Sequence, residues 1–173
     1  MTGRIIVDGY NLMYASERLE SILREDFEAA RQTLLSDLVE YCDREEREVE
    51  VVFDAAGAGG AERHEKRSRF LSVTFTAGGK TADACVEALI YGVPRGGAGS
   101  VTIVTGDYEI QRIASGVGML RMSSREFLEE MRDSEERWRA ELKSRRTRRQ
   151  RVRLDERIST DVRAALERFR HRR

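Results

Sequence analysis

Four aspartates are the residues of this sequence best placed to do chemistry, because of where they stand relative to its apolar runs. Three of them each close a different short apolar run, and the fourth lies in the first turn of a predicted helix; they are Asp8, Asp54, Asp107 and Asp83. The carboxyl ends of parallel strands meet at one edge of an α/β sheet, where such sheets bind their ligands. We therefore expect the four carboxylates to converge there.

Converging carboxylates repel one another, and no lysine or arginine is built into the same motifs to neutralise them. A divalent cation would resolve this repulsion. Carboxylate ligands with open water positions suit Mg²⁺ or Mn²⁺, whereas zinc prefers histidine and cysteine. A cation held in this way generates a hydroxide nucleophile and stabilises charge on a phosphodiester. The alternative for any single aspartate is a helix cap or a strand-end turn, but four at matching positions favour the metal site.

The first apolar run, Ile5-Ile6-Val7, predicts the central element of the fold. Three consecutive β-branched residues without alternation are typical of a strand buried on both faces, and hence of a parallel sheet covered by helices. Gly9 permits a sharp turn after Asp8. The remaining pattern predicts the order β-α-β-β-α-β-α-β-α, an α/β fold with a mostly parallel sheet.

The other expected elements follow from apolar spacing and turn residues. Strands are expected at 49–54, 71–76 and 100–105 and within 117–122, and the strand at 71–76 is expected to be half-exposed. Helices are expected at 25–46, from 81, at 108–115 and from 123, where Ser123 and Glu126 form a capping-box pattern. Residues 14–21 and 55–61 are expected as loops.

The formal charge of zero conceals an uneven distribution. Residues 1–133 hold 16 basic and 24 acidic residues, a net charge of −8, whereas residues 134–173 hold 15 basic and 7 acidic residues, a net charge of +8. We expect a catalytic body over 1–133 and an arginine-rich helical extension over 134–173, in which a basic linker at 143–153 precedes a final helix. Such a tail is typical of a segment that meets a polyanion. The alternative is that its arginines pair with nearby glutamates or with the acidic body.

Two cysteines, Cys42 and Cys85, lie far apart in predicted helices, which favours buried free thiols in a reducing compartment over a disulfide. The sequence has no uncharged run long enough to span a membrane. We therefore expect a cytoplasmic protein.

Basic residues in two regions are expected to bind RNA phosphates, which would make binding weaken steeply with salt. They are Arg63, Lys66, Arg67, Arg69 and Lys80 in the body and Arg145, Arg146, Arg148 and Arg149 in the tail. His64 lies within the first group and is expected to contact RNA or solvent rather than a metal.

The motifs around the aspartates resemble one family over essentially the whole chain. Val7-Asp8-Gly9-Tyr10-Asn11, Val51–Ala55, Thr81-Ala82-Asp83 and Thr105-Gly106-Asp107-Tyr108 closely resemble the YacP-like branch of the NYN-domain ribonucleases, relatives of PIN-domain nucleases. The resemblance implies a PIN-like three-layer α/β sandwich. It also implies an endoribonuclease dependent on Mg²⁺ or Mn²⁺ that acts on messenger RNA in association with the ribosome.

Carried over motif by motif, the resemblance makes the four aspartates metal ligands and makes Asn11 an amide that binds the metal or its ligands. Thr105 would position a water or a phosphate, or else cap the following helix. Glu87 would orient the acidic residues, or else lie on a solvated helix face. Tyrosines near the site would stack on bases, or else pack at its rim; they are Tyr10, Tyr14 and Tyr108.

Two positions depart from the family pattern. Gly106 stands where a serine is expected before the last aspartate, and the loop at 56–60 is unusually rich in glycine. The function predicted from the sequence is cleavage of single-stranded RNA. The alternatives are a non-catalytic RNA- or ribosome-binding module with the same fold, and a phosphatase acting on small phosphoesters, which would have no use for the arginine-rich tail.

Overall fold

The computed structural model describes residues 3–54, 61–94 and 96–170, and from residue 149 onward it describes the backbone together with the side chain of Val162. The chain divides into two compact units, Met1–Ser134 and Glu135–Arg173. The first unit holds every strand of the described chain and the predicted acidic site.

A six-stranded sheet forms the middle layer of the first unit, with the strand order β3-β4-β2-β1-β5-β6. Every neighbouring pair is parallel except β3 with β4, so the predicted mostly parallel sheet is confirmed. The strands are β1 (Arg4–Asp8), β2 (Val49–Phe53), β3 (Arg63–Lys66), β4 (Leu71–Phe75), β5 (Val101–Val104) and β6 (Leu120–Met122).

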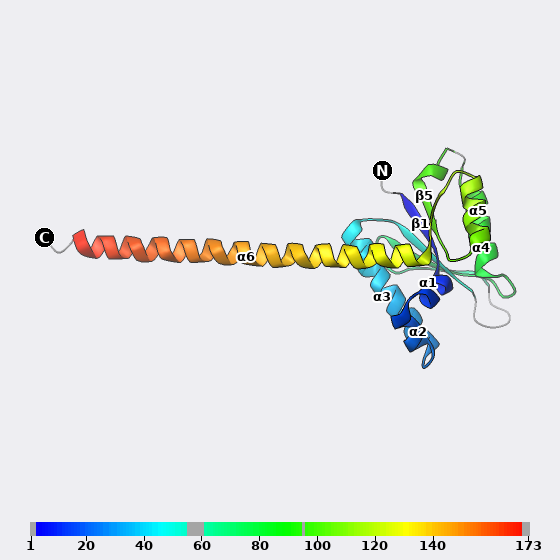
Figure 1. Cartoon of the computed structure of the whole chain (residues 1–173), viewed down its shortest axis with the longest axis horizontal. Helices are drawn as coiled ribbons and strands as arrows, with labels where there is room; N and C mark the ends of the chain where they lie inside the picture. The colour runs from blue at the N-terminus through cyan, green and yellow to red at the C-terminus, as the bar shows by residue number, and fades with distance from the viewer. Residues whose placement is uncertain (1–2, 55–60, 95, 171–173) are drawn as a thin grey trace. The chain divides into compact units, whose positions relative to one another are not determined.

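Helices cover both faces of this sheet, which gives the three layers that the family resemblance implies (Figure 1). They are α1 (Gly9–Ala15), α2 (Glu17–Leu23), α3 (Phe27–Glu45), α4 (Ala82–Gly92), α5 (Tyr108–Gly116) and α6 (Ser124–Arg170), with a short 3-10 turn at Ala98–Ser100. Helices α1 to α3 and the start of α6 pack on one face, and α4 and α5 pack on the other.

The central strand β1 shows why the sequence folds in this way. Ile5 and Val7 enter the core under α1 to α3, while Ile6 enters the core under α4 and α5, and all three are fully buried. A continuous apolar run is needed here because both faces of the strand are covered. The expectation from the sequence is confirmed at this strand.

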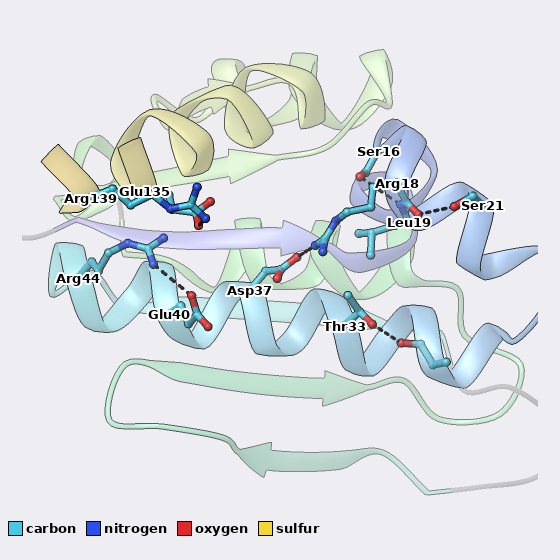
Figure 2. A network of polar contacts seen from close by, with 11 residues as sticks. Ser16, Arg18, Leu19, Ser21, Thr33, Asp37, Glu40, Arg44, Glu135 and Arg139 are labelled. Carbon is cyan, nitrogen blue, oxygen red and sulfur yellow. Dashed lines mark hydrogen bonds and ion pairs between the residues drawn. The ribbon is translucent and has the colours of Figure 1, made fainter. Parts of the chain in front are cut away.

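The predicted loop at 14–21 is wrong, because most of it belongs to α1 and α2. Asp8 caps α1, and the Ser16 hydroxyl accepts from the Leu19 amide to cap α2. Short helices depend on such caps and on tertiary contacts more than on apolar periodicity. An ion pair between Arg18 and Asp37 ties α2 to α3 (Figure 2).

The strand at 71–76 was predicted to be half-exposed, but in β4 only Ser72 is exposed. The basic segment Arg63–Lys66 forms β3, which pairs antiparallel with β4. Strand β3 is therefore the edge strand, and β4 has a neighbouring strand on each side. Four mostly charged residues carry little β propensity, so β3 exists because β4 offers it a free edge.

The predicted basic linker is also wrong, because α6 runs without a break from Ser124 to Arg170. The segment at 143–153 contains no glycine or proline, and arginine, lysine and glutamine favour helix. Pairs one turn apart support it, such as Arg145 with Glu141 at 3.6 Å. The predicted capping box is confirmed, since Ser123 and Glu126 each accept from the other's backbone amide. None of the described helices is long and apolar enough to cross a bilayer.

Candidate active site

Three of the four aspartates stand at the carboxyl ends of β2, β1 and β5, three neighbouring strands in which β1 is parallel to the other two. Asp8 is the last residue of β1, and Asp54 directly follows β2. Asp107 caps α5 just beyond β5, and Asp83 lies in the first turn of α4, whose cap is Thr81. Strand ends and helix starts thus bring together residues that are far apart in the sequence.

The carboxyl groups lie close enough to act on one another. The Asp83 carboxyl is within hydrogen-bonding reach of Asp8, and its pKa is raised by burial and then by the charges of Asp8 and Asp107. Burial, with a smaller contribution from Asp83, raises the pKa of Asp54. Burial is also the main reason that the pKa of Asp8 is raised, and the charge of Asp54 adds to it. The predicted convergence is what the structure shows.

Asn11 holds the most buried of these carboxyls. Its backbone amide donates to Asp8 Oδ1 at 3.0 Å and its side-chain Nδ2 donates to Asp8 Oδ2 at 2.5 Å. Both bonds act against the raised pKa of Asp8 by favouring its charged form. Gly9, which lies between Asp8 and Asn11 in the sequence, is required because a Cβ there would stand 2.3 Å from the Phe53 ring. Asn11 therefore acts on Asp8 and fixes its orientation.

Asp54 carries an oxygen that the protein leaves unused. Its Oδ1 is buried and has no hydrogen-bond partner among the described residues. The Ala82 backbone amide donates to the Asp54 carboxyl and partly offsets the rise in its pKa that burial causes. The Tyr10 hydroxyl donates to the Asp54 backbone carbonyl at 3.1 Å. A buried carboxylate oxygen without a donor is the atom that a cation would bind.

The donor chemistry of the four aspartates fits a hard divalent cation, since they offer carboxylate oxygens. Within residues 3–54, 61–94 and 96–170, no three Asp, Glu, His or Cys side chains are already arranged to hold a metal ion. A bound cation would therefore have to draw the carboxylates inward by rotating their side chains.

Thr105, Gly106 and Asp107 form the turn between β5 and α5. The Thr105 hydroxyl accepts from the Asp107 amide at 3.0 Å, and Asp107 Oδ1 accepts from the Glu109 and Ile110 amides at 2.6 and 3.2 Å. The structure thus uses Thr105 within the turn and Asp107 as a helix cap. A Cβ on Gly106 would stand 2.8 Å from Asn11 Oδ1, so glycine at this position makes room for the Asn11 amide.

The remaining predicted residues around the cluster divide into packed and exposed ones. Tyr10 packs against Phe27 and Phe53, with ring centroids 5.5 and 5.3 Å apart. Tyr14 and Tyr108 are 60% and 73% exposed and are free to stack on a base. Glu87 is half-buried one turn after Asp83 on α4.

The basic residues predicted to surround the site do not gather there. Arg63 pairs across the sheet with Phe75, at the aspartate end of β4, and its guanidinium lies 4.5 Å from the centre of that ring. Lys66 and Arg69 instead line a cleft of about 430 Å³ beside the first residues of β1, β2 and β4, at the opposite end of the sheet. Because β3 runs antiparallel to β4, one basic segment reaches both ends.

The other predicted cations have partners or stand apart. Arg67 pairs with Glu65 at 2.7 Å, and Lys80 is exposed. His64 lies 2.9 Å from Glu62 and 2.9 Å from the Thr74 hydroxyl, which keeps it away from the aspartates. On α6 the exposed arginines Arg145, Arg146 and Arg148 face solvent, whereas the side chain of Arg149 and the loop at 56–60 lie outside the described residues.

Sequence reasoning missed Arg31 of α3. Its guanidinium lies 5.0 Å from the Phe75 ring centre. Burial raises the pKa of Tyr10, and the charge of Arg31 partly offsets this rise. An arginine inside a helical pattern is normally taken as part of a solvated face, and nothing in the sequence shows that α3 turns this residue toward the aromatic side chains beside the site.

Comparison with known proteins identifies relatives of this chain. A curated relative, the uncharacterized protein YacP of Bacillus subtilis (strain 168), is 35% identical over 133 residues, which is 77% of each chain. The crystal structure of Rae1 (YacP) from Bacillus subtilis superposes with a TM-score of 0.65 at 28% identity and covers 97% of this chain and 94% of that chain. The crystal structure of a point mutant of the same protein gives the same TM-score of 0.65 at 29% identity and covers 83% of both chains.

The match reaches beyond the first unit. The model of the family described as YacP-like NYN domain covers residues 5–171, from β1 to the end of α6. All four aspartates and the basic helix lie inside this range. The chain therefore belongs to the YacP-like NYN domain family, a nuclease-like family.

Proposed function

We propose that this protein is a divalent-metal-dependent endoribonuclease that cleaves single-stranded RNA by attack of an activated water on the phosphodiester. The observation that carries the proposal is the cluster of four carboxylates, in which Asp54 Oδ1 is buried without a partner among the described residues. Burial and mutual repulsion disfavour charge on Asp8, Asp54 and Asp83 in the protein alone. A bound cation would favour the charged forms of these carboxyl groups.

Each residue of the cluster has a distinct task in this proposal. Asp8, Asp54, Asp83 and Asp107 would hold Mg²⁺ or Mn²⁺. The cation supplies a water of lowered pKa and stabilises charge on the phosphate. Asn11 keeps Asp8 oriented through its two hydrogen bonds. Asp107 also anchors α5 through Oδ1, so only its other oxygen remains for a metal.

Features outside the cluster support RNA as the substrate. Tyr14 and Tyr108 are exposed aromatic side chains, and bases stack on such rings. Arg63 stands at the same end of the sheet, and the exposed arginines of α6 suit a phosphate backbone. We include in the proposal that the RNA is messenger RNA and that cleavage takes place on the ribosome, as the family resemblance implies. We also propose a cytoplasmic location, which the two free cysteines support.

A non-catalytic RNA-binding module is the second candidate. It is favoured by one observation, namely that no three ligands in the described part of the chain are already in place for a metal. The retention of all four carboxylates favours the enzyme, because a binding module has no need to place so many like charges together.

The test compares RNA cleavage by the full chain with Mn²⁺, with Mg²⁺ and with EDTA. A matched pair of variants, Asp8→Asn and Asp133→Asn, separates the site from the surface, because Asp133 is exposed on α6. We expect cleavage by the wild type and by Asp133→Asn with metal, and none by Asp8→Asn or in EDTA. Binding of RNA without cleavage under every condition would favour the non-catalytic module, and cleavage unaffected by EDTA would contradict the metal mechanism.

A further inference from the structure

Ser124, the first residue of α6, carries a buried hydroxyl that the protein does not use. Its side chain is 2% exposed, and its Oγ has no hydrogen-bond partner among the described residues. Its neighbour Ser123 differs, since the Ser123 hydroxyl accepts from the Glu126 amide at 3.2 Å and caps the helix. Leaving a buried hydroxyl without a partner costs about 1–3 kcal/mol, so a native structure that keeps one usually does so for a reason.

The hydroxyl and the Asn11 amide that holds Asp8 both lie near Gly106. Ser124 Oγ is 4.0 Å from the point where a Cβ on Gly106 would stand, and Asn11 Oδ1 is 2.8 Å from the same point. The pairing of Val104 with Met122 brings the start of α6 to this turn. Because Gly106 has no side chain, nothing of its own separates the hydroxyl from the amide oxygen.

The two groups are complementary in hydrogen bonding. The amide nitrogen of Asn11 is committed to Asp8 Oδ2, and its oxygen Oδ1 is an acceptor. The Ser124 hydroxyl is a donor without an acceptor among the described residues. A reversed amide would turn Oδ1 toward the Asp8 carboxylate, and the two oxygens would repel each other. A donor to Oδ1 would favour the observed orientation of the amide further.

We propose that Ser124 is a positioning residue of the aspartate site. Its hydroxyl donates to Asn11 Oδ1 in the working site, directly or through one water, and thereby keeps Nδ2 on Asp8. The kinetic part of this inference rests on the proposed nuclease function. The stability and spectroscopic parts do not.

The first test compares the stability of two adjacent serine variants. Ser124→Ala removes a hydroxyl whose proposed acceptor is Asn11 Oδ1 and which caps no helix, so its Tm in EDTA should fall by less than that of Ser123→Ala. Ser123→Ala removes a helix cap, so its Tm should fall by about 2–4 °C. A fall for Ser124→Ala as large as that for Ser123→Ala would show a purely structural hydroxyl and would overturn the inference.

The second test measures RNA cleavage in a double-mutant cycle. Ser124→Ala should cleave about 10-fold more slowly than the wild type, as is common when a residue that orients a metal ligand is lost. In an Asn11→Ala background, Ser124→Ala should change the rate no further, because its effect passes through Asn11. Wild-type cleavage by Ser124→Ala, or an equal effect in both backgrounds, would refute the link.

The third test observes the Asn11 side chain by NMR and does not depend on RNA cleavage. In ¹H–¹⁵N spectra of the full chain, the side-chain amide resonances of Asn11 should move in Ser124→Ala and stay in place in Ser123→Ala. Unmoved Asn11 resonances in both variants would overturn the inference. If the wild type cleaves no RNA, the nuclease proposal fails, and this measurement still decides whether Ser124 acts on Asn11.

Discussion

The two ends of the central sheet treat buried carboxylates in opposite ways. At the start of the strands, Glu50 of β2 is 6% exposed and forms an ion pair with Arg4, and the Thr74 hydroxyl donates to its Oε1 at 2.9 Å. At the other end, Asp8 is similarly buried among further carboxylates, and an asparagine is its main partner.

This difference shows that burial by itself does not mark a functional carboxylate. A buried charge that has its own cation and hydrogen bonds is complete within the protein, and Glu50 fits that description. At the aspartate end, Asp8 is buried beside carboxyl groups that are partly or largely exposed, and the pKa values of Asp8, Asp54 and Asp83 are raised, first by burial and then by neighbouring carboxylate charges. In the proposed function, a bound cation supplies the positive charge that this group of aspartates lacks.

The largest expected effect comes from exchanging one carboxylate at each end for its amide. Asp54→Asn should lower RNA cleavage by more than about 100-fold, because it alters a proposed metal ligand. Its unfolding free energy should stay equal or rise, since a repelling charge is removed. Glu50→Gln should keep near wild-type cleavage and lose about 1–2 kcal/mol of stability, since Arg4 is partly exposed. RNA cleavage rates and urea unfolding measure these effects in both variants. If the two variants lose the same activity and the same stability, the two ends of the sheet do not differ in the way described.

A glycine substitution sharpens the same comparison at Asn11. Gly106→Ala places a methyl group 2.8 Å from Asn11 Oδ1 and should displace the amide from Asp8, lowering cleavage about 10-fold. Gly116→Ala in α5 is the matched control, because a Cβ there meets nothing within 4 Å. We expect the control to cleave as the wild type does and to gain a few tenths of a kcal/mol of stability. Equal rates for both variants would mean that Asn11 does not need its present position.

The smallest expected effect is a pH dependence of stability in EDTA. In the folded protein the pKa of Asp83 is raised above the ordinary value of 3.8 that it has in the unfolded chain. The folded state therefore binds a proton on Asp83 more tightly than the unfolded state, and protonation favours folding. The stability that Asp83 contributes is complete below that pKa and is lost as the pH rises through its raised folded value. Asp83→Asn should therefore gain stability relative to the wild type as the pH rises from about 4 to 7. Urea unfolding at both pH values measures this, and an unchanged or opposite difference would contradict it.

Several parts of this protein follow from local sequence. The continuous apolar run of β1 predicts a doubly covered strand, and Asp8 at its end predicts a site at the carboxyl edge of the sheet. The repeat of that pattern at Asp54 and Asp107 predicts the convergence. The predictions of the strand and of the convergence are confirmed because the period and burial of a strand depend on residues that are neighbours in the sequence.

Other parts depend on partners distant in the sequence. The edge strand β3 forms because β4 is beside it, and its direction sends Lys66 and Arg69 to the end of the sheet away from the aspartates. Ser124 is adjacent in sequence to a helix cap, but in space its hydroxyl lies 4.0 Å from the point where a Cβ on Gly106 would stand.

The sequence by itself determined the layered α/β fold and the four acidic residues that share one edge of its sheet, since apolar periodicity and strand-end residues are local properties. Only the tertiary structure decided which of the buried polar groups are satisfied. Arg4 completes Glu50, whereas Asp54 Oδ1 and the Ser124 hydroxyl are left without partners among the described residues. The physical reason is that a hydrogen bond or ion pair requires contact within a few ångström, and the packing of the whole chain sets those contacts.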